Sequence, residues 1–320
     1  MSFTPHPALR AAHAQTIFAA FAPRPAIAWE RERVELDDGD FVDLDHAPGP
    51  ASGRRALVLH GLGGSSEAPY VRGLTAALAA SGWGVTAFNF RGASGEPNRL
   101  ARTYHSGDTA DVRVVARLLR ARVAADPLVA VGFSMGANAL LKLLGEDGAR
   151  PTFDAAVAVS SPFVLRICAH TLARGLAAGY GRYLLRGLKR MLRAKRALVA
   201  PRLDLRAALG ARDFAAWDEL VTAPLNGFAS AADYWARASS SRYVASIAAP
   251  TLILHARDDP FMTPAVLPSR AELPPRTVLE ASARGGHVGF VARGPRGLPR
   301  YHVDERVAAW LGGMFGPAAR

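Results

Sequence analysis

The stretch LVAVGFSMGANALLK, residues 128–142, is the part of the sequence from which the fold can be worked out. Its first four residues are apolar and predict a buried strand, and ANALLK predicts a helix. Between them, Gly132, Ser134 and Gly136 form the pattern G-x-S-x-G. The glycines permit a tight turn, so the serine hydroxyl projects above the sheet at the helix N-terminus. This context indicates a nucleophile at Ser134; a glycine-rich turn that merely packs is the alternative.

Short apolar runs recur on both sides of this stretch. Such uninterrupted runs are typical of strands that are buried on both faces of a mostly parallel sheet. They cover residues 56–60, 84–90, 128–133, 155–160, 251–255 and 277–279. Helical patterns lie between most of them, at 71–80, 109–123 and 135–145, and a last one follows at 307–314. The alternation predicts an α/β fold with a doubly wound sheet.

Two regions depart from this alternation. Residues 27–36 and 40–45 alternate in polarity around Asp37-Asp38-Gly39, which predicts an N-terminal antiparallel hairpin. Residues 162–249 contain helical segments without a convincing strand, and strand-like sequence resumes after Pro250. We therefore expect a core made of residues 1–161 and 250–320, with a helical cap, residues 162–249, inserted in it. In enzymes such insertions usually cover a site.

A serine needs a base and an orienting carboxylate before it can act as a nucleophile. Asp258 and Asp259 follow the run at 251–255, and His287 lies on a glycine-flanked loop after the run at 277–279. The carboxyl ends of parallel strands meet at one edge of a sheet, where ligand and catalytic groups gather. Alone, an Asp-Asp-Pro segment is usually a solvated turn, and a single histidine usually packs or caps another element. Serine, acid and histidine in this order, each after a strand, predict a catalytic triad.

A glycine-rich loop, HGLGGSS at residues 60–66, follows the run at 56–60. Glycines there allow backbone amides to approach a bound carbonyl group. We assign the amides of Leu62 and Met135 as the two donors of an oxyanion hole. A phosphate-binding loop is the alternative, but Gly-Lys-Ser/Thr and the dinucleotide glycine spacing are absent.

Several long motifs resemble the YheT-like α/β-hydrolases, also labelled AB-hydrolase 4. They are HGLGGSSEAPYVRGL (60–74), NFRGASGEPNRLARTYHSGDTADVR (89–113), VGFSMGANALLKLLGE (131–146), PTLILHARDDPF (250–261) and GGHVGF (285–290). The early His13-Ala14-Gln15-Thr16 is similar to that family's N-terminal segment. The resemblance implies an α/β-hydrolase fold with a cap and a Ser-Asp-His triad. Members are described as carboxylesterases, or as lipid-ester hydrolases and acyltransferases.

The resemblance matches Ser134 to the nucleophile and His287 to the base, and it leaves the acid to be chosen between two neighbours. We prefer Asp258, because it falls where the usual G-x-x-D acid lies, with His255 at the glycine position. Asp259 is the alternative. His105, in the segment YHSGD, is interpreted as structural or as part of the wall of the site.

These residues favour acyl transfer to Ser134 from an uncharged ester with an apolar acyl group. The cap offers Phe163, Val164, Leu165, Leu172 and Tyr180 for a pocket. No metal or organic cofactor is implied. An acyltransferase would use the same acyl-enzyme with an alcohol as acceptor, and a binding protein on this fold would use none of this chemistry. A dehalogenase would need a carboxylate at the nucleophile position, which Ser134 does not supply.

Composition narrows the class of protein further. The chain has 320 residues and 33.9 kDa, is 50% hydrophobic and carries a formal net charge of +12. Its one cysteine, Cys168, excludes an internal disulfide and a cysteine-based zinc site. No nucleic-acid-binding motif accompanies the basic charge, so we expect no nucleic-acid partner. The sequence shows neither a secretory signal nor a membrane span, so we expect a cytoplasmic protein.

One segment of the cap concentrates basic residues. Between positions 182 and 196 there is no acidic residue, and the basic ones are Arg182, Arg186, Lys189, Arg190, Arg193, Lys195 and Arg196. Five leucine or methionine side chains fill another face at helical spacing: Leu184, Leu185, Leu188, Met191 and Leu192. The simpler interpretation is a cap helix with its basic side in water. The sharper one is peripheral contact with an anionic membrane.

Overall fold

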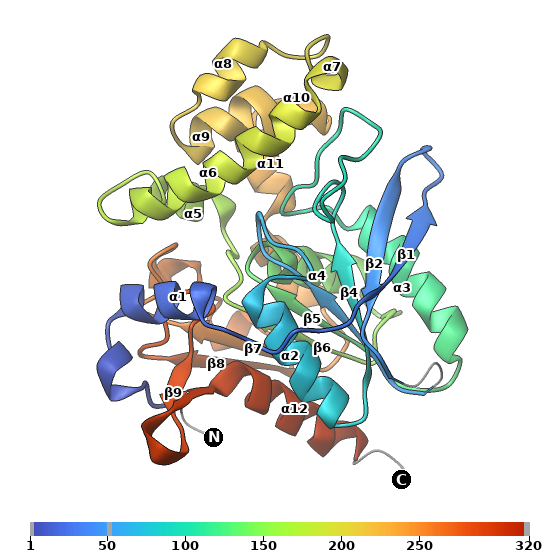
Figure 1. The fold of residues 1–320 in the computed structure, drawn as a ribbon, viewed down its shortest axis with the longest axis vertical. Helices are drawn as coiled ribbons and strands as arrows, with labels where there is room; N and C mark the ends of the chain where they lie inside the picture. The colour runs from blue at the N-terminus through green and yellow to red at the C-terminus, as the bar shows by residue number, and fades with distance from the viewer. Residues whose placement is uncertain (1–2, 50–52, 317–320) are drawn as a thin grey trace.

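The predicted strands form one eight-stranded sheet in the computed structural model, which describes residues 3–49 and 53–316 (Figure 1). The strand order is β1-β2-β4-β3-β5-β6-β7-β8. The bounds are β1 Glu30–Glu35, β2 Phe41–His46, β3 Arg55–Leu59, β4 Gly84–Asn89, β5 Leu128–Phe133, β6 Ala155–Val159, β7 Thr251–Ala256 and β8 Thr277–Ser282. β2 is antiparallel to β1 and to β4, and the remaining neighbours are parallel. The predicted α/β class and N-terminal hairpin are confirmed.

Helices cover both faces of this sheet because alternate strand residues point to opposite sides. On one face α2 (Pro69–Ala80) and α12 (His302–Phe315) pack against Val58, Val85 and Val131. On the other face lie α3 (Ala110–Val123) and α4 (Met135–Asp147). Both hydrophobic clusters are fully buried at their centres. Because β3 to β8 pair in parallel, their carboxyl ends share one edge of the sheet.

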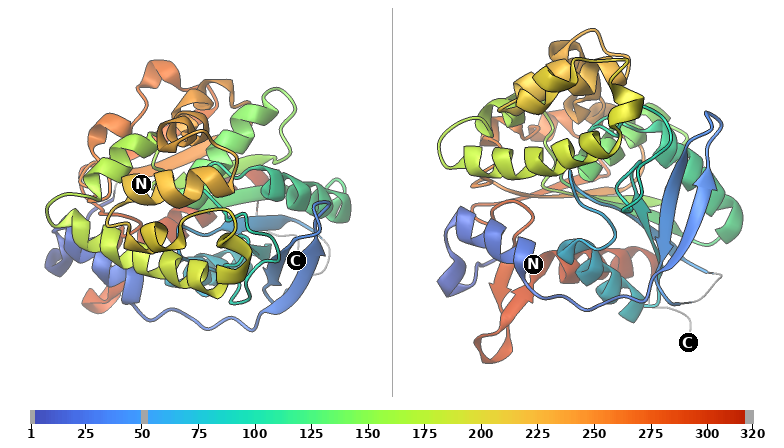
Figure 2. Two further views of the ribbon diagram at one scale, coloured as in Figure 1. Left: turned by 90° about the horizontal axis from the view of Figure 1, so that it is seen from above. Right: turned by 45° about the horizontal axis from the view of Figure 1, so that its top comes forward.

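Between β6 and β7 the chain leaves the sheet. Residues 160–250, all of them described, contain helices and no strand. The helices are α5 Leu165–Thr171, α6 Ala177–Ala194, α7 Arg196–Val199, α8 Leu205–Gly210, α9 Phe214–Trp217, the π-helix η2 Asp218–Thr222, α10 Ala223–Leu225 and α11 Ala231–Ala238. They share a hydrophobic cluster of their own and lie above the sheet (Figures 1 and 2). We propose to treat residues 162–249 as the cap and the rest as the core.

In the core, one helix and one small hairpin were not predicted. Helix α1 (Ala12–Phe21) has no side-chain cap at its N-terminus, so the sequence gives it no start signal. A small hairpin pairs β9 (Val291–Arg293) with β10 (Pro299–Tyr301), and each strand is too short to show a period. The α1 segment lies beside the last third of the chain, and Pro5 forms a β-bridge with Ala292.

The basic segment forms α6 and the start of α7, with the expected two faces. Leu185, Leu188 and Leu192 are buried against the cap. The arginines that are exposed are Arg182, Arg186, Arg190, Arg193 and Arg196. Lys195 differs from this expectation: it is buried, and its ammonium group donates to Asn98 Oδ1 at 2.6 Å and to the Arg102 carbonyl at 2.7 Å. It ties the cap to a core loop instead of facing water.

No helix within residues 3–49 and 53–316 combines the length and the apolar character that a bilayer span requires.

Candidate active site

Ser134 occupies the sharp turn between β5 and α4. Its backbone has φ 51° and ψ −117°, a region that non-glycine residues seldom adopt. A Cβ atom on Gly132 would lie 2.5 Å from the carbonyl oxygen of Gly136, and one on Gly136 would lie 2.5 Å from that of His60. Both glycines of the motif are therefore required by the close approach of backbone to backbone. The strained turn is typical of a functional serine.

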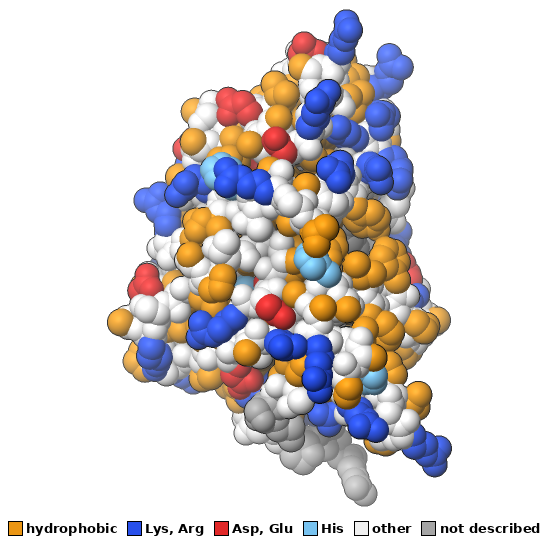
Figure 3. All heavy atoms as spheres, turned by 90° about the vertical axis from the view of Figure 1, so that its left-hand side faces the viewer, with side chains coloured by type: hydrophobic (Ala, Val, Ile, Leu, Met, Phe, Trp, Pro, Cys, Tyr) orange, Lys and Arg blue, Asp and Glu red, His pale blue; other side chains and the backbone are white. Residues whose placement is uncertain are grey.

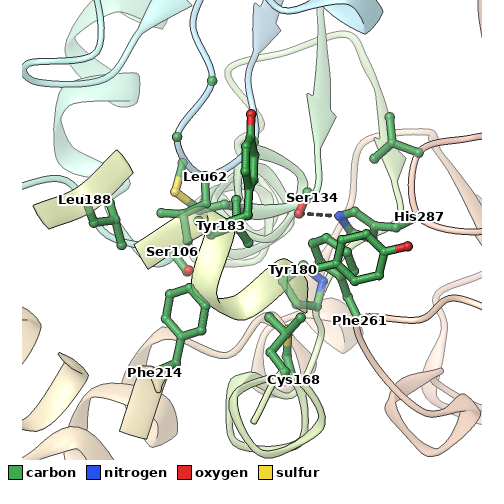
Figure 4. Close-up of a pocket in the computed structure, with 18 of the residues that line it drawn as sticks. Leu62, Ser106, Ser134, Cys168, Tyr180, Tyr183, Leu188, Phe214, Phe261 and His287 are labelled. Atoms are coloured by element: carbon green, nitrogen blue, oxygen red, sulfur yellow. Dashed lines mark hydrogen bonds between the residues drawn. The ribbon is translucent and has the colours of Figure 1, made fainter. Parts of the chain in front are cut away.

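The side chains of Ser134, His287 and Asp259 form one hydrogen-bonded chain at the carboxyl edge of the sheet. His287 Nε2 lies 2.9 Å from Ser134 Oγ (Figure 4), and His287 Nδ1 lies 2.8 Å from Asp259 Oδ2. A carboxylate at this distance only accepts, so Nδ1 carries the hydrogen and Nε2 accepts from the serine hydroxyl. Asp259 and His287 are buried. The arrangement can remove a proton from the serine as it attacks a carbonyl group.

The preference for Asp258 is corrected by this geometry. Asp258 follows β7 as expected, but its Oδ1 accepts a hydrogen bond of 3.0 Å from the amide of Gly286. The turn after β7 brings the next residue, Asp259, to the imidazole instead. Asp258 therefore holds the histidine loop by its backbone, while its neighbour contacts the ring. Sequence spacing could not separate the two, because one residue of register in a turn decides which side chain points to the loop.

The loop after β3 approaches Ser134 at Gly61, next to the residue assigned to the oxyanion hole. The phenol of Tyr70 accepts from the amide of Gly61 at 2.9 Å, and that of Tyr104 accepts from Gly63 at 3.0 Å. Among the described residues, no hydrogen-bond partner accepts from the amide of Leu62. Met135 is the first residue of α4, where an amide has no partner within the helix. Both amides assigned to an oxyanion hole are thus available for a ligand.

His60 contacts the backbone of the loop after β3 through both ring nitrogens. Its Nε2 accepts from the amide of Phe90 at 3.3 Å, and its Nδ1 lies 2.7 Å from the Gly61 carbonyl. Burial lowers the pKa of His60 to about 4, so the ring is neutral at pH 7. A neutral imidazole that donates at one nitrogen and accepts at the other satisfies both backbone groups.

Helix α1 supports the histidine loop, which sequence reasoning alone did not predict. Thr16 Oγ1 accepts from the amide of His287 at 2.9 Å. Gln15 is fully buried, and its Oε1 accepts from the amide of Val291 at 2.6 Å while its Nε2 donates to the Val291 carbonyl at 3.0 Å. In the sequence, only the family resemblance points to the segment His13-Ala14-Gln15-Thr16. Its polar residues serve a loop that lies more than 270 positions later in the chain.

Aromatic side chains connect His287 to the cap. The Phe261 ring stacks on the imidazole, with centroids 3.9 Å apart and planes 9° apart. Tyr180 of α6 lies against Phe261 at 5.1 Å, and its hydroxyl lies 2.9 Å from His13 Nδ1. Figure 4 shows Tyr180, Phe261 and His287 grouped on one side of Ser134. The cap, α1 and the histidine loop therefore meet at one point of the site.

A cavity of about 950 Å³ lies between core and cap, and Ser134 and His287 both line it. Of the five cap residues expected to form a pocket, Leu165, Leu172 and Tyr180 line this cavity. The other two do not: Phe163 belongs to the core cluster, and Val164 packs against it. Leu62 and Met135 contribute to the wall. Its lining is mostly apolar side chains, as ligand pockets usually are.

The titratable side chains that line the cavity include Asp218, which is buried, and His105 and Cys168, which are half-buried. Burial lowers the pKa of His105 to about 3, and its Nδ1 accepts from the Gly107 amide at 3.1 Å, which fits the wall role expected for it. Burial raises the pKa of the Cys168 thiol, and the Asp259 and Asp218 carboxylates raise it further. In the part of the chain that the structure describes, no three His, Cys, Asp or Glu side chains group as metal ligands.

Comparisons with known proteins identify the family of the chain. Residues 57–293 match the alpha/beta hydrolase fold family. The chain is 41% identical over 285 residues to YheT of Escherichia coli (strain K12), whose name provisionally describes it as an esterase; the match covers 88% of this chain and 84% of that protein. Phospholipase ABHD3 of Mus musculus is 29% identical, over 87% of this chain and 70% of its own. Monoacylglycerol lipase of Saccharomyces cerevisiae is also 29% identical, over 73% and 54%.

Solved structures share the fold. The Pyrococcus furiosus esterase Pf2001 superposes with a TM-score of 0.57 at 18% identity, over 92% of this chain and 99% of that one. The 2,6-dihydroxy-pseudo-oxynicotine hydrolase superposes with a TM-score of 0.58 at 17% identity, over 95% and 72%. At this identity the likeness speaks for the fold alone.

Proposed function

Because the chain belongs to the YheT-like α/β-hydrolases and is a carboxylic ester hydrolase, we propose that it cleaves apolar esters through an acyl-enzyme on Ser134. The observation that carries this proposal is the hydrogen-bonded chain from Ser134 Oγ through His287 to Asp259, opening on a largely apolar cavity. It supplies a nucleophile, a base and an orienting acid in contact with one another.

In the proposed mechanism, Ser134 Oγ attacks the ester carbonyl carbon while its proton passes to His287 Nε2. Asp259 keeps the imidazole in the required tautomer and stabilises its cation. The amides of Leu62 and Met135 donate to the oxyanion, an effect of roughly 3–4 kcal/mol for a good donor. His287 then protonates the leaving alcohol. Water, deprotonated by the same nitrogen, attacks the acyl carbon and releases the acid and Ser134.

The proposed substrate is an uncharged ester with an apolar acyl chain, of the lipid-ester class. The mostly apolar walls of the cavity support an apolar chain, and its volume of about 950 Å³ suits a ligand of that size. Relatives named for monoacylglycerol and phospholipid hydrolysis support the lipid class. Apolar contacts discriminate by about 1–3 kcal/mol per methylene, so rates should change smoothly with chain length.

The surface around the cavity supports contact with a lipid surface. Four large hydrophobic residues of its lining are exposed: Ile17 50%, Phe21 69%, Leu176 78% and Tyr183 60%. Figure 3 shows hydrophobic side chains gathered on this face below a cap that carries many Lys and Arg side chains. An apolar rim beside a basic helix face is the combination that draws a protein to an anionic bilayer. We propose peripheral contact of this kind, with no nucleic acid as partner.

Ser134→Ala tests the proposal. The variant should lose hydrolysis of a nitrophenyl ester series by several orders of magnitude, on the order of a million-fold as in a measured serine protease. It should also lose labelling by a fluorophosphonate probe, while its thermal unfolding changes little. Retention of most of the activity in purified variant protein would end the proposal. Product analysis with added alcohol separates hydrolysis from acyl transfer, because an acyltransferase would form a new ester.

A further inference from the structure

Asp218 is a polar group in the wall of the cavity that the proposed chemistry does not use. It begins the π-helix η2 in the cap and is only 7% exposed. Its Oδ1 accepts from the Thr222 hydroxyl at 2.7 Å, and its Oδ2 accepts from Trp235 Nε1 at 2.8 Å. The apolar side chains Phe214 and Trp217 line the cavity beside it. Single π-helical turns are frequent at functional sites.

The partners of Asp218 are both neutral. Within residues 3–49 and 53–316, no Lys or Arg forms an ion pair with it. A carboxylate in an apolar wall without a cation is costly, and such residues are almost never fully buried unless they are paired. Burial raises the pKa of Asp218 to about 7, which reflects this cost. A carboxylate has about four acceptor positions, and the two internal bonds use half of them.

Asp218 lines the same cavity as Ser134 and His287. The carboxylates of Asp259 and Asp218 both raise the pKa of the Cys168 thiol. Tyr234, whose pKa burial and Asp218 raise, accepts from the amide of Ser106 at 3.0 Å. The Ser106 carbonyl in turn accepts from Asn138, one helical turn after Ser134. A ligand bound at Ser134 can therefore extend along this wall.

On these observations we propose that Asp218 is a recognition site for a free hydroxyl group of the substrate. The inference rests on the proposed ester hydrolysis and narrows its substrates to apolar esters that carry a hydroxyl. A neutral hydroxyl donor uses a spare carboxylate lone pair without adding charge to the apolar wall. A cationic group fits less well, because the chain carries a net charge of +12 and an arginine-rich cap helix.

The hydroxyl has two possible sources, and matched ester pairs distinguish them. In the first pair, 1-monodecanoylglycerol is compared with propyl decanoate, which lacks the two hydroxyls of the alcohol part. In the second, the ethyl ester of 10-hydroxydecanoic acid is compared with ethyl decanoate. For wild type we expect kcat/KM to favour the hydroxylated member of one pair by tenfold to hundredfold, since a hydrogen bond to a charged group has roughly that effect.

Asp218→Asn is the decisive variant because it keeps the internal bonds. The amide oxygen can accept from Trp235, and the amide nitrogen can donate to the Thr222 hydroxyl. We expect the hydroxyl preference to fall at least tenfold in this variant and in Asp218→Leu. Asp204→Asn is the matched control, because Asp204 is a cap aspartate that caps α8 and does not line the cavity. It should retain the wild-type preference.

Each other outcome has a separate meaning. An equal fall of both members of a pair in Asp218→Asn, with the preference retained, would make the residue structural and overturn the proposal. Absence of a hydroxyl preference in wild type, or its survival in Asp218→Asn, would overturn it as well. Failure of wild type to hydrolyse any of the four esters would instead contradict the proposed function itself.

Discussion

Two adjacent carboxylates hold the His287 loop in different ways. Asp259 contacts the imidazole ring, and Asp258 accepts from the backbone amide of Gly286. We expect Asp259→Asn to lower kcat by about 10⁴-fold, because an amide cannot keep the ring in its working tautomer. Asp258→Asn should have a much smaller effect, since the amide oxygen can still accept from Gly286. Ester hydrolysis by the two purified variants, with circular dichroism to verify folding, measures the difference. The reverse order would return the relay role to Asp258.

The raised pKa of Asp218 has a consequence for stability. Its folded-state value of about 7 lies above the usual 3.8, so between about pH 4 and pH 7 the folded state keeps a proton that the unfolded state has lost. The residue's contribution to stability therefore becomes less favourable as the pH rises through this window. We expect Asp218→Asn to gain stability relative to wild type between pH 5 and pH 8, on the order of a few kcal/mol. Urea unfolding of both proteins at the two pH values measures it; a gap that does not grow with pH would contradict it.

At the scale of elements, α1 acts as a brace for the histidine loop. Thr16→Val removes the acceptor of the His287 amide while keeping the volume of the side chain. The loop should lose its fixed position, so we expect kcat to fall about tenfold with little change in KM. Thr16→Ser should restore activity, because it restores the hydroxyl. Steady-state kinetics on a short nitrophenyl ester separates the two constants.

Thr75→Val in α2 is the matched control for this substitution. Its hydroxyl is fully buried without a hydrogen-bond partner among the described residues, so its loss should leave kcat unchanged and should not lower stability. An equal fall of kcat in both variants, or full activity of Thr16→Val, would show that α1 does not position His287.

Which elements could be predicted depended on how their residues are buried. The strands of the sheet centre are buried on both faces, so β3, β5 and β7 appear in the sequence as continuous apolar runs. Helix α1 buries Gln15 and Thr16, and these side chains stabilise a loop distant in sequence by accepting hydrogen bonds from its backbone. A hydrophobic pattern carries no signal for such a contact. The π-helix η2 that holds Asp218 was missed for the same reason, because its geometry comes from packing within the cap.

At the scale of the whole molecule, the site was predictable where each group stands at the end of its own strand. Ser134 and His287 follow β5 and β8, and their glycine-rich surroundings identify them. The choice between Asp258 and Asp259 depended on the conformation of the turn after β7, which sets the side chain that reaches the imidazole. The cavity depended on how a cap of some ninety residues lies on the core, which no local pattern describes. The identity of the carboxylate at His287 and the shape of the cavity therefore depend on packing between segments that are distant in the sequence.

The charge of the molecule leads to a prediction about membranes. Wild type should sediment with anionic vesicles at low salt and much less at high salt, because such attraction is screened. Changing Arg186, Arg190 and Arg193 together to Gln should weaken binding about a hundredfold, at about 1 kcal/mol for each basic residue near the surface. The exposed Arg117, Arg150 and Arg276, changed to Gln, form a control with the same change in charge. Equal, salt-insensitive binding to neutral and anionic vesicles, or none, would leave α6 as an ordinary cap helix.

The contact between α1 and the histidine loop also has a consequence for folding during synthesis. Thr16 and His287 are 271 positions apart, so this contact closes almost the whole chain into a loop. Contacts of such high sequence separation cost the most entropy to close and tend to form late in folding. Domains begin to fold during synthesis, starting from the N-terminal side. Helix α1 can therefore make these contacts only after residues 285–291 have been synthesised, and the His287 loop is held in place only from that point on.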